Sequence, residues 1–553
     1  MRRDRIAATL VAAAAAAVFA HLLDYPFLNW DDQDVFVRNE ALHAPGLAGW
    51  AFTTRYMEHY QPAAWLIWGA LARTVGLTAA TAHALTVALH ALCAAGVYVV
   101  IREALALRNG GRPAKHLEWV AAASALVWAV HPLRVEVVAW ASAMPYTLAL
   151  LAALLATWAW MRGRVATALA CLVASLLARP IAIGLPLVWV AIGPWRAAGI
   201  GLALAAAAGL VESSARLSAS LAEFGIGPRL TLAAAAPWTY LWRTVAPVGL
   251  TPLDPLALTP RADPAIIGAG FAATALVSAL AWRWRRIAPV PAAAWLAYLA
   301  LLAPAMGLVP SGLQATADRY VYVAGVPLSV ALAAALAARA RSAAPKTAGT
   351  RVSWLGLSAL GVVLILAGAA WRHSAHWRDS VALWTRAVTI DPRNDVALYN
   401  LATALAEAGQ RDAALTRYDE LLQLVPAHAD ARRNRALLRA QAAEEEGNAL
   451  AARGRLAEAV DRYGEATTLD PRRTHSHAAR GMALVELGRL TEAGSHLRIA
   501  IEQGVADPAV PNALAYVLVQ AGDRAGALAV LREARRRFPA DENIARNLAL
   551  LGK

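Results

Sequence analysis

Long apolar runs separated by short basic segments fill the first two thirds of the chain, and a spaced pattern of small residues fills the rest. Apolar runs near the ~20 residues needed to cross a bilayer are typical of transmembrane helices. After a first run that ends at Leu23, further spans are predicted at 80–101, 117–130, 146–160, 165–177, 181–192, 197–211, 265–280, 290–309, 321–336 and 355–370. The pattern therefore predicts an all-α, polytopic body of about eleven spans over residues 1–372.

The first run follows a basic start, which fits either a signal peptide or a retained span. We expect a retained span, because many spans follow and no small-residue cleavage pattern precedes Asp24.

Lys and Arg gather in alternate loops, as they do in loops that face the cytoplasm. The residues concerned are Arg2, Arg3, Arg5, Arg102, Arg108, Arg112, Lys115, Arg162, Arg164, Arg196, Arg283, Arg285, Arg286, Arg339, Arg341, Lys346 and Arg351. The outer loops are then 24–79, 131–145, 212–264 and 310–320. An odd number of spans places the remainder of the chain in the periplasm, so we expect a multi-pass protein of a bacterial inner membrane.

Beyond residue 372 the sequence becomes more polar and repetitive. Gly409, Gly454, Gly488 and Gly522 recur together with Ala414, Ala459, Ala493 and Ala527, spaced by 45, 34 and 34 residues. This period is typical of tetratricopeptide repeats, which are stacked pairs of helices. We predict a repeat domain over 373–553, with a half repeat at 378–392 and repeats at about 395–427, 440–472, 474–507 and 508–540. We expect the small residues to let paired helices approach closely, and the longer first interval to lengthen one helix.

Composition supports a membrane protein: 59% of the residues are hydrophobic, 16% are charged and the mean hydropathy is +0.44. The net charge of +14 comes with basic loops between apolar runs, which indicates membrane topology and contact with lipids, not nucleic acid. The two cysteines, Cys93 and Cys171, lie inside apolar runs, so neither a disulfide framework nor a cysteine metal cluster is expected.

Two neighbouring carboxylates, Asp31 and Asp32, stand in the first outer loop, followed by Tyr60 and Gln61. Helix capping in a solvated loop would explain the acids without function. A carboxylate beside apolar surface can instead have its pKa raised towards neutrality and accept a proton from an attacking hydroxyl.

Further polar residues follow the apolar runs in the outer loops. His131, Arg134 and Glu136 come directly after one span, Arg179 lies between two short runs, and Asp318-Arg319-Tyr320 begins a late span. Charges so close to lipid are costly unless they are paired or functional. An Arg134–Glu136 ion pair and an Asp318 helix cap are structural explanations, whereas a guanidinium could bind a phosphate.

Taken together, the chain resembles the transmembrane and tetratricopeptide-repeat O-mannosyltransferases and their bacterial relatives, which have the GT-C fold. The stretches that carry the resemblance are Asn29-Trp30-Asp31-Asp32, Tyr60-Gln61-Pro62, 83–90, 131–140, Arg179-Pro180 with Leu185-Pro186, and Ala317-Asp318-Arg319-Tyr320. They follow the family's order and cover most of the chain.

The resemblance implies inverting transfer of a mannose-like sugar from a polyprenyl phosphate to an acceptor hydroxyl on the outer face. It implies Asp31 as general base, with Asp32 and Glu136 as supporting carboxylates. Donor-phosphate contacts would come from Arg319, Arg179, Asp318, Arg134 and His131, and acceptor or loop contacts from Tyr60, Gln61 and Tyr320. The acceptor would be Ser or Thr of a polypeptide recruited by the groove of the repeats.

The stretch 143–146 departs from the family, because relatives often carry a charged pair there, and Arg179 often stands as Lys in relatives. Two alternatives stay open: a glycan or lipid acceptor, and a catalytically inactive, membrane-anchored adaptor, which the departure at 143–146 favours. Paired carboxylates can hold a divalent cation or act as base and orienter. We expect no metal and no cofactor beyond the lipid-linked donor.

Overall fold

The computed structural model describes residues 2–108, 117–190, 195–213, 225–255, 262–308, 314–341 and 348–552. The chain forms two compact units, Met1–Asn400 and Leu401–Lys553, and the division falls within helix α18 (Asp395–Glu407). Arg112, Lys115 and Lys346 of the predicted inner loops lie outside the described residues. The same holds for 214–224, 256–261 and 310–313 of the predicted outer loops.

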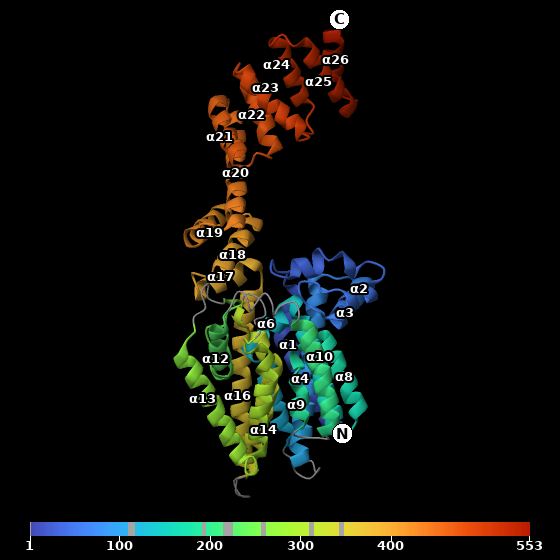
Figure 1. Cartoon of the computed structure of the whole chain (residues 1–553), viewed down its shortest axis with the longest axis vertical. Helices are drawn as coiled ribbons and strands as arrows, with labels where there is room; N and C mark the ends of the chain where they lie inside the picture. The colour runs from blue at the N-terminus through green and yellow to red at the C-terminus, as the bar shows by residue number, and fades with distance from the viewer. Residues whose placement is uncertain are drawn as a thin grey trace. The chain divides into compact units, whose positions relative to one another are not determined.

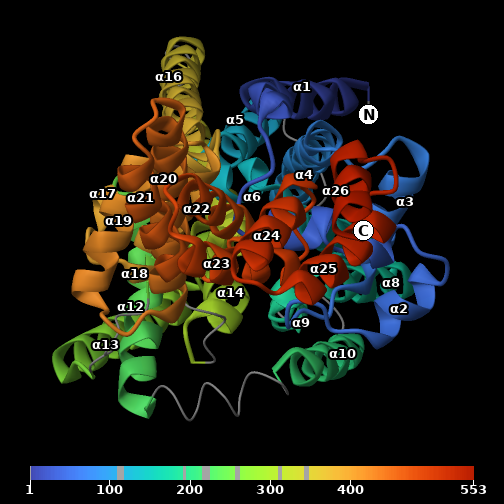
Figure 2. The ribbon, with the colours of Figure 1, turned by 90° about the horizontal axis from the view of Figure 1, so that it is seen from above.

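Apolar helices, most of them long, run side by side in the first unit (Figure 1). They are α1 (Arg2–Phe19), α4 (Ala79–Arg108), α5 (Leu117–Ala129), α7 (Met144–Met161), α8 (Val165–Ala178), α9 (Leu185–Val190), α10 (Trp195–Ser213), α12 (Ile226–Val245), α13 (Pro264–Trp284), α14 (Pro289–Leu302), α15 (Val321–Arg341) and α16 (Ala348–Ser374). Figure 2 shows α10, α13 and α16 at the rim of this bundle. Among the described residues, none of α13 is buried, which fits a helix that faces lipid.

Six described helices are long and apolar enough to cross a membrane, and seven if α5 and α6 (Val135–Ala139) form one span bent by 60°. The prediction of about eleven spans was therefore too high by this criterion. Four of the predicted spans fall on short apolar helices: those of α8, α10 and α14 do not reach the length of a span, and α9 has only six residues. The region 212–264, expected to be an outer loop, contains α12, because its polar residues interrupt the apolar run without interrupting the helix.

Contacts at the two ends of the bundle fix the direction of its helices. At one end, Arg102 of α4 contacts Asp4 of α1 at 2.6 Å, and Arg162 after α7 contacts Glu103 at 2.5 Å. At the other end, His21 lies 2.7 Å from Ser374, the last residue of α16. Helices α1 and α16 therefore run in the same direction, and α16 ends on the side away from these basic residues.

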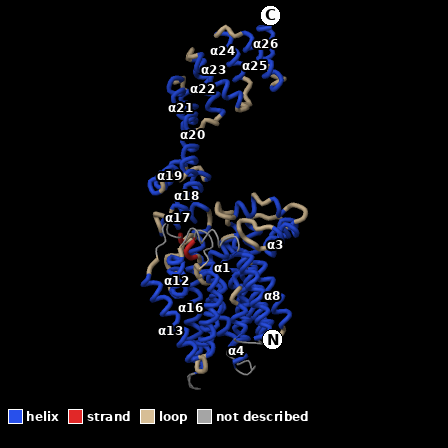
Figure 3. The backbone as a smooth tube through the Cα atoms, in the orientation of Figure 1, coloured by secondary structure: helices blue, strands red, loops and turns tan. Residues whose placement is uncertain are grey.

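Shorter elements lie at the end of the bundle where α16 ends. They are α2 (Leu47–Thr53), α3 (Pro62–Thr74), α17 (Ser380–Ile390) and the strands β1 (Asp254–Pro255) and β2 (Gln314–Thr316). The strands pair antiparallel (Figure 3). Asn29 ties the first loop to this end, because its backbone N–H donates to Ser380 Oγ at 2.9 Å and its Oδ1 accepts from Trp384 Nε1 at 2.7 Å.

The second unit is a stack of antiparallel helices. After α18 come α19 (Arg411–Leu424), α20 (Ala429–Ala452), α21 (Leu456–Leu469), α22 (Thr474–Glu486), α23 (Leu490–Glu502), α24 (Ala509–Gln520), α25 (Arg524–Arg537) and α26 (Glu542–Gly552). The longer first interval of the repeats falls in α20, which has 24 residues. Ala414, Ala459, Ala493 and Ala527 are fully buried between paired helices. The half repeat is the single helix α17, and α26 is an additional terminal helix.

The recurring glycines have a different role from the expected one. Gly409, Gly454, Gly488 and Gly522 have φ between +74° and +80°, and a Cβ built on any of them meets no atom within 4 Å. They end helices in the left-handed conformation that side chains oppose, so they permit turns and do not permit close packing.

We therefore expect Gly454→Ala to destabilise the turn between α20 and α21 by about 1–2 kcal/mol, the usual cost of a left-handed residue with a Cβ. Hydrogen–deuterium exchange of the full chain should show faster exchange in these two helices. Gly454→Asn is the matched control and should destabilise the turn less than Gly454→Ala does, because Asn adopts the left-handed conformation more readily. Equal exchange in the Ala variant and the wild type would contradict this explanation.

Candidate functional site

Asp32 organises the first outer loop. Its carboxylate is fully buried and accepts hydrogen bonds from the backbone N–H groups of Leu28 and Ser142, both at 3.0 Å, and from the Ser142 hydroxyl. Burial raises the pKa of Asp32 to about 6, although these three hydrogen bonds oppose the rise. The side chain thus joins the loop to the segment before α7, which is a structural task.

Asp31 is placed differently from its neighbour. It is partly exposed, and its side chain accepts no hydrogen bond from the described residues. Burial raises the pKa of the Asp31 carboxyl, while the positive charges of Arg319 and Arg179 oppose the rise. Of the two neighbouring acids, Asp31 is therefore the one whose carboxylate is not occupied by hydrogen bonds within the loop.

A buried ion pair joins Glu136 to Arg319. Glu136 lies on α6, the short helix that follows the break at Pro132, and Arg319 lies in a 3-10 turn just before α15. The two side chains form a salt bridge, and the Arg319 backbone N–H donates to the same carboxylate at 3.1 Å. The guanidinium also lies over the rings of Trp140, at 5.4 Å, and Tyr320, at 5.1 Å.

Arg179 is presented by a helix end. Helix α8 stops at Ala178, because the residue before a proline disfavours helical geometry, and Arg179 is extended. Its Nη1 donates to Gln61 Oε1 at 3.0 Å, and its Nη2 lies 3.2 Å from His59 Nε2. The guanidinium lies 5.0 Å from the ring centre of Tyr146.

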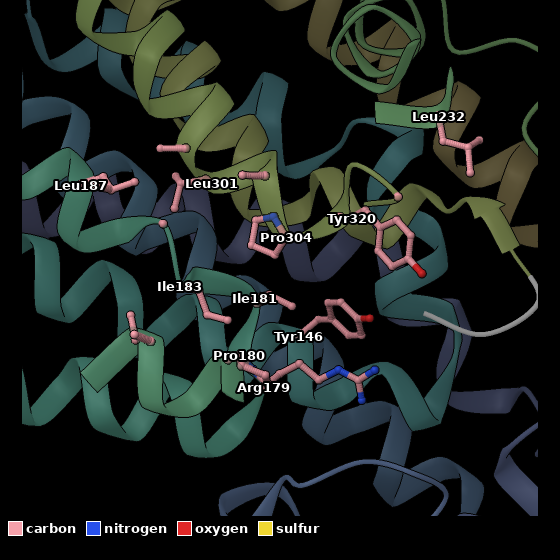
Figure 4. Close-up of a pocket in the computed structure, with 18 of the residues that line it drawn as sticks. Tyr146, Arg179, Pro180, Ile181, Ile183, Leu187, Leu232, Leu301, Pro304 and Tyr320 are labelled. Carbon is pink, nitrogen blue, oxygen red and sulfur yellow. The ribbon is translucent and has the colours of Figure 1, made fainter. Parts of the chain in front are cut away.

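A cavity of about 550 Å³ lies beside Arg179 (Figure 4). The polar ends of Tyr146, Arg179 and Tyr320 gather on one side, and Ile183 and Leu301 lie towards the other. The remaining lining residues are almost all apolar and include Pro180, Ile181, Leu187, Leu202, Leu232 and Pro304. A site with one charged end and an apolar body fits a ligand with an anionic head and a hydrocarbon chain.

Gly184 fixes one wall of this cavity. A Cβ at Gly184 would collide with the carbonyl oxygen of Ala300, so the backbone just before α9 meets that of α14 here without an intervening side chain.

The structure places other predicted residues away from the cavity. His131 caps a 3-10 turn by accepting from Leu133 N–H at 3.2 Å, and its Nε2 lies 3.0 Å from the Thr244 carbonyl oxygen. The Arg134 guanidinium donates to the Val321 carbonyl oxygen at 3.0 Å and does not pair with Glu136. Both side chains are buried in structural contacts, so the structure does not bring them to the expected phosphate position.

Asp318 and Tyr60 also have local partners. Asp318 accepts from Arg243 at 3.4 Å, and Arg243 pairs at the same time with Asp254 at 3.1 Å. This network ties α12 and β1 to the start of α15, and it replaces the helix cap that Asp318 could have formed. The Tyr60 hydroxyl donates to the Phe52 carbonyl oxygen at 3.3 Å.

Sequence reasoning did not select Arg243, His59 or Tyr146 as site residues. His59 stands two residues before Gln61 and could have been found from the His-Tyr-Gln-Pro stretch, whereas nothing local distinguishes Arg243. For metals, the described residues contain no group of three or more His, Cys, Asp or Glu side chains that could hold an ion.

Comparisons with known proteins match the repeats. Residues 396–428 match the tetratricopeptide repeat model, and no curated protein matches the chain. The chain is similar to YrrB, described as a TPR protein with an unusual peptide-binding site (17% identity, 30% of this chain, 80% of YrrB, TM-score 0.19). It is also similar to pilF of Pseudomonas aeruginosa (16% identity, 41% of this chain, 88% of pilF, TM-score 0.21). A further similar structure is the TPR2AB domain of yeast Sti1 (16% identity, 39% of this chain, 96% of that chain, TM-score 0.20). The chain thus contains tetratricopeptide repeats, which indicate a role in protein interaction.

Proposed function

We propose that the protein transfers a sugar from a polyprenyl-phosphate donor to an acceptor hydroxyl. The observation that carries this proposal is the cavity of about 550 Å³, apolar along its length and ending at Arg179, with the Asp31 carboxylate within the influence of that guanidinium. An apolar lining suits a prenyl chain, and a guanidinium suits its phosphate.

In the proposed reaction, the acceptor oxygen attacks the anomeric carbon from the side opposite the phosphate. The bond between that carbon and the phosphate oxygen breaks with inversion, and its electron pair leaves on the phosphate. Asp31 accepts the hydroxyl proton, and Arg179 stabilises the phosphate charge. Arg319, already paired with Glu136, serves mainly to hold positive charge near Asp31.

The repeats extend this proposal to the acceptor. Stacked helix pairs form extended concave surfaces that hold polypeptides, so we assign Ser or Thr of a polypeptide as the acceptor. The alternative is a membrane-anchored adaptor without catalysis, which the uncharged stretch 143–146 supports and the intact carboxylates Asp31 and Glu136 oppose.

A transfer assay tests the function. Purified protein in nanodiscs is supplied with polyprenyl-phosphate mannose and a Ser/Thr-rich peptide, and mannosylated peptide is measured by mass spectrometry. Arg179→Ala should raise the donor KM by about 10- to 100-fold, which corresponds to the free energy that hydrogen bonds to a charged group contribute to binding. Arg498→Ala, on α23 of the repeats, is the matched control and should leave the donor KM unchanged. Donor binding that is equal in wild type and Arg179→Ala would contradict the proposal, and donor binding without transfer to any acceptor would favour the adaptor.

For localisation, we propose that the repeats lie in the periplasm of a bacterial inner membrane. The support is that α1 begins among the basic residues, which favour the cytoplasmic side, and that α16 runs parallel to α1. A reporter that is active only in the cytoplasm should therefore stay silent when fused after Lys553, and the same reporter fused after Arg164 should be active. A strong signal from the C-terminal fusion would reverse the proposed orientation.

A further inference from the structure

A tight turn with unusual backbone geometry precedes α3. Met57 and Glu58 have φ values of +51° and +63°, and among the described residues they are the only non-glycine residues with positive φ. They form the centre of a two-residue turn between Tyr56 and His59, which is closed by a hydrogen bond from His59 N–H to the Tyr56 carbonyl oxygen at 3.0 Å. Such turns normally use Asn or Gly, because a Cβ opposes this conformation. Backbone strain of this kind persists where the surroundings hold it in place.

The surroundings of this turn are well packed. The Tyr56 hydroxyl donates to the Asp34 carbonyl oxygen at 2.9 Å, and the Tyr56 ring packs edge-on against Trp65 of α3 at 5.6 Å. Trp65 is itself buried. The turn therefore holds His59 at a fixed place, next to Arg179.

His59 binds Arg179 in a way that preserves the positive charge. A guanidinium can only donate, so His59 Nε2 must accept at 3.2 Å, and the imidazole is neutral with its proton on Nδ1. Gln61 Oε1, the second hydrogen-bond partner of Arg179 among the described residues, is also neutral. Arg319 differs, because a carboxylate pairs with it directly.

We propose that His59 is a positioning residue that aligns the Arg179 guanidinium for an anionic ligand head at the end of the cavity, and that the strained turn exists to hold His59 there. The inference rests on the proposed function, which assigns the donor phosphate to Arg179. Two neutral acceptors and the Tyr146 ring fix the orientation of Arg179 without neutralising it, so its remaining N–H groups and its charge are available to the phosphate.

The first test compares two replacements of His59 in the nanodisc assay with polyprenyl-phosphate mannose. His59→Phe keeps a ring but removes the acceptor, and the donor KM should rise about tenfold while kcat changes less than about twofold, since the base Asp31 is untouched. His59→Gln supplies a carbonyl acceptor and should recover most of the donor affinity. A purely structural role would lower the amount of folded protein in both variants without separating their KM values.

The second test changes the turn and leaves His59 in place. Glu58→Gly and Glu58→Val both remove the carboxylate, so their difference isolates the backbone. Glycine adopts a φ of +63° without strain, whereas a β-branched residue opposes it. Glu58→Gly should keep the wild-type donor KM, and Glu58→Val should raise it as much as His59→Phe does.

The outcomes separate the two proposals. If Arg179→Ala loses donor affinity but His59→Phe and Glu58→Val retain it, the positioning role of His59 is wrong and the proposed function stands. If Arg179→Ala itself retains full donor affinity, the proposed function is wrong, and the positioning role falls with it. A donor KM that rises equally in His59→Phe and His59→Gln would also overturn the inference, because the acceptor would then be irrelevant.

Discussion

Asp31→Asn should reduce the rate of sugar transfer by about 10²- to 10⁴-fold, the usual contribution of a general base. Asn has nearly the same shape as Asp but cannot accept the hydroxyl proton. Because Arg179 and Arg319 remain in place, the donor KM should change far less than kcat. The measurement is single-turnover transfer from polyprenyl-phosphate mannose to the peptide acceptor.

The pH dependence of the same reaction provides an independent check. The base acts only when ionised, so the rate should fall as the pH drops through the pKa of Asp31. Burial raises this pKa, so the acidic limb should lie above the ordinary carboxyl value of about 3.9. This limb should vanish in Asp31→Asn. Near-normal transfer by this variant, or an unchanged acidic limb, would remove Asp31 from the role of base.

Asp32→Asn is the matched control for Asp31→Asn. The two oxygens of the buried Asp32 carboxylate accept from the backbone N–H groups of Leu28 and Ser142, whereas Asn keeps only one accepting oxygen and leaves one of these N–H groups facing an NH₂ donor. The Asp32→Asn variant should therefore have a first loop of lower thermal stability. Its activity should fall only as far as its amount of folded protein falls.

Glu136→Leu should lower the free energy of unfolding by about 3–5 kcal/mol, because it leaves the Arg319 guanidinium buried without its charged partner. Thermal unfolding in detergent, followed by circular dichroism, measures the effect. The double variant Glu136→Leu with Arg319→Met removes both charges and should recover most of the lost stability, since apolar residues of similar volume often replace a buried pair at little cost.

The double variant also separates stability from function. It should be folded, yet transfer should still be slower than in the wild type, because Asp31 loses the nearby positive charge of Arg319. A Glu136→Leu variant as stable as the wild type would mean that the ion pair contributes nothing. A double variant with full activity would mean that Arg319 has no electrostatic role.

The fold was predictable from the sequence where the signal is local. Apolar runs predict membrane helices because they are continuous in the sequence, and the recurrence of Gly and Ala predicts the repeats because it keeps a nearly constant interval. Short helices such as α9 were harder, because their membrane character depends on neighbouring helices. The recurring glycines of the repeats were recognised, but their structural role was not. Residue type alone does not tell whether a glycine permits close packing or a positive φ.

The site was predictable only in part, for a geometric reason. Arg134 and Glu136 are two residues apart, and their proximity in the sequence suggested an ion pair. Residues at this spacing do not face each other along a helix. Arg134 instead reaches the Val321 carbonyl oxygen, and Glu136 pairs with Arg319. Partners so distant in the sequence cannot be identified from spacing.

Gly184 and Ala300 both line the cavity, and here the two backbones are packed so closely that no side chain fits between them. Side-chain substitutions along the lining can change how well a hydrocarbon chain is held, but they cannot move the two helices closer at this point. At this point the distance between the two walls of the cavity is therefore determined by the backbone and not by side chains. Under the proposed function, we therefore expect the cavity to discriminate between donors by the thickness of the lipid chain next to the phosphate.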